Sequence, residues 1–169
     1  MRIVLVGMMG SGKSSVGRAL AQETGWPFHD NDALLERATG RTARELSEGA
    51  ERALRAAESS ALREGLRMPE PSIVASAAGV VLDAADRARL AEEPAVVWLR
   101  ARPGTLAQRL AGSDDDHRPW LDRDPATWLR ETDAIRAPHF GAVADLVVDV
   151  DEMDPATVAH RILAMLART

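Results

Sequence analysis

Short apolar runs recur along the chain, and a stretch of helical or polar character separates each run from the next. The first run, Ile3–Val6, is unbroken and largely β-branched, which is typical of a strand buried on both faces of a parallel sheet. The other predicted strands are Trp26–His29, Ser72–Ser76, Ala95–Leu99 and Ala144–Val148.

Helical patterns lie between these strands. A helix is predicted over residues 13–24, because Val16 and Leu20 share one face and Gly25 follows as a stop. Strands that alternate with helices predict an α/β fold of three layers, with helices on both faces of a parallel sheet, in a single domain over residues 1–169. Further helices are predicted over residues 30–40, 50–66, 84–91, 106–111 and 155–166, with helix starts at the Thr42–Glu45 capping box and at Asp124-Pro125.

Composition excludes several classes of function. The chain has 169 residues, of which 46% are hydrophobic and 28% charged, as expected for a soluble globular domain. Its net charge of -5 argues against a nucleic-acid partner, and the absence of cysteine excludes disulfides and thiolate metal sites. The apolar run at the N-terminus is too short for a signal-peptide core or a membrane span. We therefore expect a cytoplasmic protein without a membrane partner, and a monomer by default.

The residues after the first strand match the phosphate-binding pattern G-x-x-x-x-G-K-[ST], from Gly7 to Ser14. Glycines in this pattern let backbone N–H groups surround phosphates, and the start of the next helix adds its positive dipole end. Lys13 is expected to bind the β- and γ-phosphates of ATP, and the Ser14 hydroxyl to bind Mg²⁺. Lys13 is also the single lysine beside 20 arginines, which indicates a position where a guanidinium cannot serve. The predicted cofactor-binding residues of this loop are Gly10, Ser11, Gly12, Lys13, Ser14 and Ser15.

Two carboxylates end the second predicted strand, in the sequence His29-Asp30-Asn31-Asp32. The carboxyl ends of parallel strands border the ligand crevice, so these carboxylates are expected beside the phosphates. Asp30 is then a candidate for holding Mg²⁺ through water, and Asp32 for orienting the hydroxyl of an acceptor. The alternative is that one of them only caps the next helix, and the spacing favours neither interpretation.

Charged residues on two predicted helices also allow two interpretations. Arg55 and Glu58 lie three residues apart, which by pattern alone favours a surface ion pair. Arg136 precedes Ala137-Pro138 and is predicted at a helix end, where a cation interacts favourably with the helix dipole. The alternative for all three residues is a role in binding the acceptor.

The segment from Gly112 to Asp124 is polar, rich in Asp and without apolar periodicity. A loop of this length inside a compact domain usually has a function. Arg118 in this loop has the chemistry of a lid arginine, which neutralises charge on a transferring phosphoryl group. The alternative is a solvated loop arginine.

These motifs, in this order, make the chain similar to the shikimate kinase family over nearly its whole length. The matching segments read GMMGSGKSS, DND, LRAAE, RPW, RAPHF and VDVDEMDP. The resemblance implies a P-loop NTPase fold with a five-stranded parallel sheet of order 2-3-1-4-5 and a mobile lid at about 112–124. It also implies an ATP-dependent kinase that phosphorylates the 3-hydroxyl of shikimate, a small-molecule substrate, in aromatic amino-acid biosynthesis.

The resemblance assigns roles to individual residues. Ser14 and Asp30 match the Mg²⁺ positions, and Arg109 and Pro155 match positions near the adenine. Two arginines suit a carboxylate ligand, because the guanidinium fork binds it bidentately. The implied catalytic residues are Lys13, Asp32 and Arg118, and the implied acceptor-binding residues are Asp32, Arg55, Glu58, Gly79 and Arg136, largely within a helical region at about 30–66.

One segment departs from the family pattern. Where the family has three consecutive glycines against the acceptor, this chain has Ala77-Ala78-Gly79. The two methyl groups matter if the backbone there needs a positive φ or a close approach. Either the loop tolerates alanine, or the pocket is shaped for another acceptor. The acidic run Asp114–Asp116 in the lid is expected to point to water.

Three functions therefore compete. The first is a shikimate kinase, and the second is a related P-loop kinase acting on another polyol or cyclitol such as gluconate. The third is a non-catalytic nucleotide-binding module. The joint presence of Lys13, Ser14, Asp30 and Arg118 disfavours the third, because a pure binding module has no use for a lid arginine.

Overall fold

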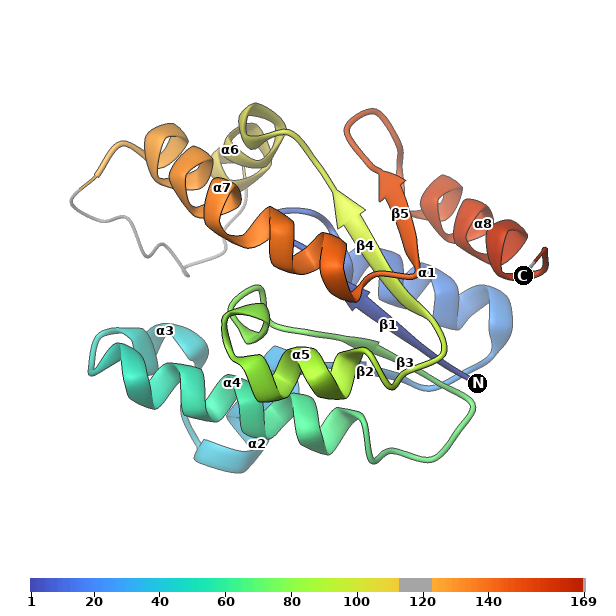
Figure 1. Cartoon of the computed structure of the whole chain (residues 1–169), viewed down its shortest axis with the longest axis horizontal. Coiled ribbons are helices and arrows are strands. Elements are labelled where there is room, and N and C mark those ends of the chain that lie inside the picture. The colour runs from blue at the N-terminus through green and yellow to red at the C-terminus, as the bar shows by residue number, and fades with distance from the viewer. Residues whose placement is uncertain (113–122, 169) are drawn as a thin grey trace.

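A parallel sheet forms the centre of the computed structural model, which describes residues 1–112 and 123–168. The strand order is β2-β3-β1-β4-β5, and every neighbouring pair is parallel (Figure 1). This confirms the fold class and the strand order that the resemblance implies. The strands are β1 Arg2–Val6, β2 Phe28–Asp30, β3 Ser72–Ala75, β4 Val96–Arg100 and β5 Leu146–Asp149.

Helices cover both faces of the sheet. Two of them, α1 and α8, pack against each other on one face, while α5 and α7 lie over the other (Figure 1). The helices are α1 Lys13–Thr24, α2 Asn31–Thr39, α3 Ala43–Ser47, α4 Glu51–Gly65, α5 Ala84–Leu90, α6 Pro103–Ala111, α7 Pro125–Val143 and α8 Pro155–Leu166, with a 3₁₀ turn η1 at Val80–Leu82.

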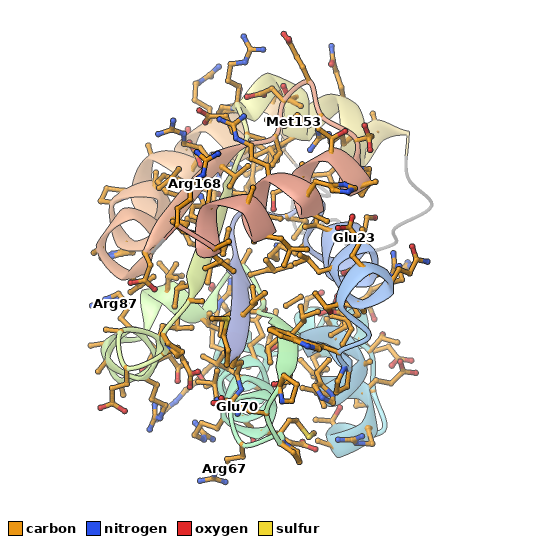
Figure 2. The ribbon with its side chains drawn as sticks, turned by 90° about the vertical axis from the view of Figure 1, so that its right-hand side faces the viewer. Glu23, Arg67, Glu70, Arg87, Met153 and Arg168 are labelled. Carbon is orange, nitrogen blue, oxygen red and sulfur yellow. The ribbon has the colours of Figure 1, made fainter. Side chains whose placement is uncertain are left out.

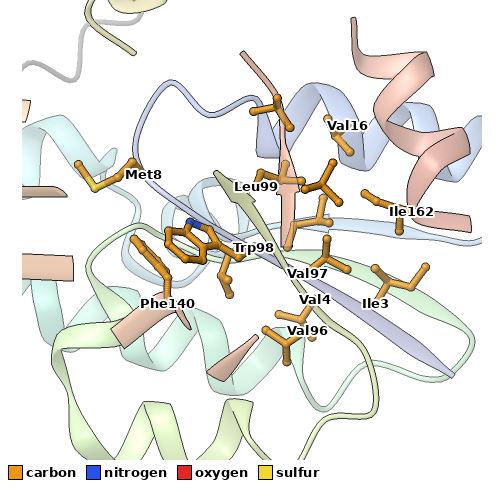
Figure 3. Close-up of a cluster of buried hydrophobic side chains, with 14 of the residues drawn as sticks. Ile3, Val4, Met8, Val16, Val96, Val97, Trp98, Leu99, Phe140 and Ile162 are labelled. Carbon is orange, nitrogen blue, oxygen red and sulfur yellow. The ribbon is translucent and has the colours of Figure 1, made fainter. Parts of the chain in front are cut away.

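The main core forms around the two central strands. β1 is buried along its whole length, and β4 is buried except at its last residue. Trp98 of β4 stacks on Phe140 of α7, with ring centroids 5.8 Å apart, and Figure 3 shows Met8 beside this pair. A second, smaller cluster joins α2, α3 and α4 through Leu34, Leu35, Leu46, Leu54 and Ala61. The block α2–α4 thus has a core of its own.

Many charged side chains lie on the outside of this architecture, but Arg2, Glu58, Asp86 and Arg136 are buried. In Figure 2, Arg87 of α5 lies at the left edge of the molecule and Arg67 lies at its lower end. Within the described ranges, no helix is both long and apolar enough to cross a membrane.

Several predicted boundaries are wrong by a few residues. β2 begins at Phe28 and not at Trp26, and α6 begins at Pro103, which takes the first helical position as proline favours. The turn η1 was not predicted. β5 runs from Leu146 to Asp149, two residues later than predicted at its start.

The prediction that Arg136 lies at a helix end is also wrong. α7 continues through Pro138 and ends at Val143. A proline inside a helix removes one backbone hydrogen bond. Phe140 and Val143, which follow the proline, are buried, and their packing offsets this loss. Arg136 therefore lies well inside a long helix and belongs to its buried face.

Candidate active site

The loop between β1 and α1 has the backbone shape that phosphate binding requires. Gly10 and Gly12 have φ values of 79° and 91°, a left-handed backbone conformation that residues other than glycine rarely adopt. The Ser11 amide donates to the Met8 carbonyl at 3.1 Å, and α1 begins at Lys13. The first turn of α1 therefore points its free N–H groups into the same cleft that Lys13 lines.

Lys13 is held inside this loop. Its Nζ donates to the carbonyl oxygens of Gly7 and Met8, each at 3.0 Å. Burial lowers the pKa of Lys13 to about 8, and the nearby carboxylates of Asp32 and Asp30 partly oppose that shift. The ammonium group is thus desolvated and close to Asp30, the last residue of β2, and to Asp32 in the first turn of α2.

Asp30 caps α2 and lines the cleft at the same time. Its Oδ1 accepts a hydrogen bond from the Asp32 amide at 3.2 Å, so Asp30 does cap α2, and because it also lines the cleft it is not limited to that role. Ser14, Asp30 and Asp32 all line the cleft. A hydroxyl and a carboxylate are oxygen ligands of the kind that Mg²⁺ prefers. In the described part of the chain, no group of three or more His, Asp or Glu side chains is arranged to hold a metal ion.

Arg55 and Glu58 form the predicted i,i+3 ion pair, but not on the surface. Arg55 Nη1 donates to Glu58 Oε2 at 2.7 Å, and Glu58 is only 6% exposed. A Cβ added at Gly79 would lie 1.9 Å from Arg55 Nη1 and 2.6 Å from Glu58 Oε2. The absence of a side chain at Gly79 therefore lets this pair lie directly against the Gly79 backbone, whose φ of -86° is ordinary. All three residues line the cleft.

Arg136 reaches the same cleft from the opposite wall. It is 5% exposed, and burial lowers its pKa to about 10, with the Arg55 guanidinium contributing in the same direction. The Arg136 guanidinium therefore remains charged at neutral pH. Among the residues that the structure describes, no carboxylate forms an ion pair with Arg136. A buried cation in this state favours an anionic ligand.

Arg109 lies beside the phosphate loop, and neither Arg109 nor Pro155 lines the cleft. Arg109 donates through Nη2 to the Val150 carbonyl, and its Nη1 lies 3.5 Å from the Gly10 carbonyl. It thus connects the phosphate loop to the segment that leads into α8. Pro155 opens α8 after the Asp154 cap. Arg118 and Asp114–Asp116 lie outside the described residues, and their roles remain predictions.

The cleft has a volume of about 340 Å³ and an apolar part that the sequence reasoning missed. It includes Met9, Ala43, Leu54 and Trp128, from the phosphate loop, α3, α4 and α7 respectively. Met9 and Leu54 lie within quoted motifs, but no pattern in the sequence shows that these four side chains line one cleft, because they meet only through the tertiary fold. Two sequence signals link members of this set to the acceptor arginines: Leu54 directly precedes Arg55, and Trp128 lies eight residues before Arg136 on one helix.

Comparisons with known proteins agree with this geometry. The family model described as "Shikimate kinase" matches residues 9–167. A shikimate kinase of Moorella thermoacetica is 38% identical over 165 residues, which cover 95% of this chain and 91% of that protein. The solved shikimate kinase of Acinetobacter baumannii in complex with shikimate has a TM-score of 0.91 and 31% identity, over 99% of this chain and 93% of that chain. A gluconokinase of Sinorhizobium meliloti 1021 is less similar, with a TM-score of 0.63 and 25% identity over 99% of this chain and 91% of its own.

Proposed function

The chain belongs to the shikimate kinase family, and on that premise we propose that it transfers the γ-phosphoryl group of ATP to the 3-hydroxyl of shikimate. One observation on this chain carries the proposal. A single cleft is lined by a phosphate-binding loop and by two arginines from opposite walls, Arg55 and Arg136. An acceptor with both a hydroxyl and a carboxylate matches this arrangement, because guanidinium groups bind carboxylates bidentately.

The phosphate loop would hold the triphosphate. Backbone N–H groups at the start of α1 would donate to phosphate oxygens, and Lys13 would exchange the Gly7 and Met8 carbonyls for the β- and γ-oxygens. Ser14 and Asp30 would hold Mg²⁺, which when bound supplies positive charge to the phosphate oxygens. Arg109 and Pro155 are proposed to lie near the adenine, beside the phosphate loop.

The other residues of the cleft would hold the acceptor. Arg136 binds its carboxylate, while the Arg55–Glu58 pair and Asp32 bind its hydroxyls. Asp32 orients the reacting hydroxyl toward the γ-phosphorus and accepts its proton as the new P–O bond forms and the bond to ADP breaks. A loose transition state demands little base strength, so positioning and charge stabilisation by Lys13 supply most of the catalysis.

A second candidate is a kinase for another polyol acid, and Ala77-Ala78 is the observation that favours it. No residue other than glycine has a positive φ in the described ranges, so both alanines occupy ordinary backbone conformations. The backbone therefore tolerates them without strain. Their methyl groups nevertheless line the cleft, where they reduce its space.

A coupled ADP-release assay over shikimate, quinate and gluconate tests the proposal. We expect turnover of shikimate to dominate, and K13A to abolish it while circular dichroism shows an intact fold. Turnover of gluconate without shikimate would favour the second candidate. ATP binding without transfer to any acceptor would favour a non-catalytic module, and activity retained in K13A would contradict the assigned mechanism.

A further inference from the structure

The cleft between the phosphate loop and the acceptor arginines has a polar part and an apolar part. Asp32, Arg55 and Arg136 provide the charged groups. The apolar groups come from separate elements, and most of them are small. Ala43, Ala77 and Ala78 each end at Cβ and offer little surface to a ligand.

Trp128 is the one aromatic side chain among the described residues that line this cleft. A tryptophan offers roughly 200 Å² of surface, several times that of an alanine methyl group. Trp128 also packs against the main core and is only partly exposed, so its indole ring has a fixed position. It lies about two helical turns from Arg136 on the same helix, α7.

On the basis of the proposed function, we propose that Trp128 determines acceptor specificity by packing against the hydrocarbon face of the acceptor ring. α7 then holds both ends of the acceptor, through Arg136 at the carboxylate and Trp128 at the ring. The C–H face of a cyclic acid can lose its water against the indole ring at little cost in free energy, because it makes no hydrogen bonds. An open-chain polyol acid has hydroxyls along its whole length, and contact with the indole ring strips water from them without replacing the hydrogen bonds.

Substitution of Trp128 should therefore affect the acceptor and not the nucleotide. We expect W128A to raise the KM for shikimate about tenfold, because a large apolar contact is lost. The KM for ATP should stay within about twofold, since the phosphates bind at the loop from Gly10 to Ser15. W128F should retain most of the affinity, because a phenyl ring keeps an aromatic surface.

The preference between acceptors gives a second, independent readout. The ratio of kcat/KM for shikimate to that for gluconate should fall in W128A. Calorimetric titration with shikimate alone should show the same weakening as the KM, which separates acceptor binding from later steps. W26F is the matched control, because Trp26 packs against the main core outside the cleft.

The outcomes separate this inference from the proposed function. A wild-type protein that does not phosphorylate shikimate contradicts the proposed function, whatever the variants do. If the wild type is active, then W128A with unchanged shikimate affinity and an unchanged acceptor ratio overturns the role of Trp128 alone. Equal increases in the KM for ATP and for shikimate, or the same effects in W26F, would indicate a merely structural role and would also overturn it.

Discussion

Two opposing effects act on the charge of Lys13. It must carry a charge to bind phosphate, yet burial in the loop lowers its pKa to about 8. The carbonyl oxygens of Gly7 and Met8 keep the ammonium group in place until a triphosphate replaces them. In the free protein near neutral pH, Lys13 is therefore mostly protonated, but its pKa lies only slightly above the pH.

The lowered pKa of Lys13 predicts that nucleotide binding depends on pH. Phosphate oxygens favour the charged form of Lys13, so ATP binding raises the pKa of Lys13 above its value of about 8 in the free protein. Above that pH, binding must take up a proton, and the affinity for a non-hydrolysable ATP analogue should fall by up to about tenfold per pH unit.

Calorimetry at pH 8.5 to 9.5, in buffers of different ionisation enthalpy, measures both the affinity and the proton uptake. K13A should lose both the affinity and its pH dependence. Affinity that stays constant across this range, with no proton uptake, would contradict the role assigned to the Lys13 ammonium.

At the scale of elements, α4 is joined to α5 by a buried carboxylate. Asp86 of α5 is fully buried and accepts hydrogen bonds from Ser59 of α4 and from Arg89, the latter at 3.0 Å. Ser59 follows Glu58 directly, and α5 follows the segment that contains Gly79. This bond therefore fixes α4, with its Arg55–Glu58 pair, against the loop that borders the cleft.

Removal of the Ser59 hydroxyl should loosen this wall. S59A leaves one hydrogen bond of a buried carboxylate unmade, at a cost of about 1–3 kcal/mol, so the Tm should fall by several degrees. The KM for the acceptor should rise more than the KM for ATP, because Arg55 and Glu58 shift and the phosphate loop does not. S60A is the matched control, since Ser60 is the exposed neighbour on the same helix. If the Tm of S59A falls but both KM values stay unchanged, the Ser59–Asp86 hydrogen bond stabilises the fold without positioning the acceptor site.

The sequence predicts some elements much better than others, for physical reasons. The glycine-rich turn between β1 and α1 can be predicted because its glycines, lysine and serine lie in one local motif, and the positive φ values of Gly10 and Gly12 agree with it. That these residues bind phosphate stays a prediction. The Arg55–Glu58 pair was predicted by spacing, but its burial was not, since burial depends on Gly79 approaching from another element. Trp128 was missed because only the packing of α7 across the sheet brings it into the cleft.

In the whole molecule, the proposed acceptor site lies between two separately packed parts of the structure. One wall is the α2–α4 block with its own small core, and the other is α7, which packs on β4 through Phe140. Arg136 of α7 has to be buried in this position without an ion-pair partner among the described carboxylates. Its depressed pKa, about 10, means that folding disfavours its charged form at neutral pH, so the residue destabilises the free protein.

Replacement of Arg136 should therefore raise stability and abolish acceptor binding together. R136M keeps an unbranched apolar stem of similar reach and removes the buried charge, so the Tm of the ligand-free protein should rise by about 2–4 °C for each kcal/mol recovered. Shikimate should raise the Tm of the wild type and not that of R136M, whereas an ATP analogue should stabilise both. R130M, at an exposed position on the same helix, should leave all of these values nearly unchanged. A ligand-free Tm lower in R136M than in the wild type would contradict this prediction. It would mean that groups of the protein itself already stabilise the Arg136 charge when no anionic ligand is bound.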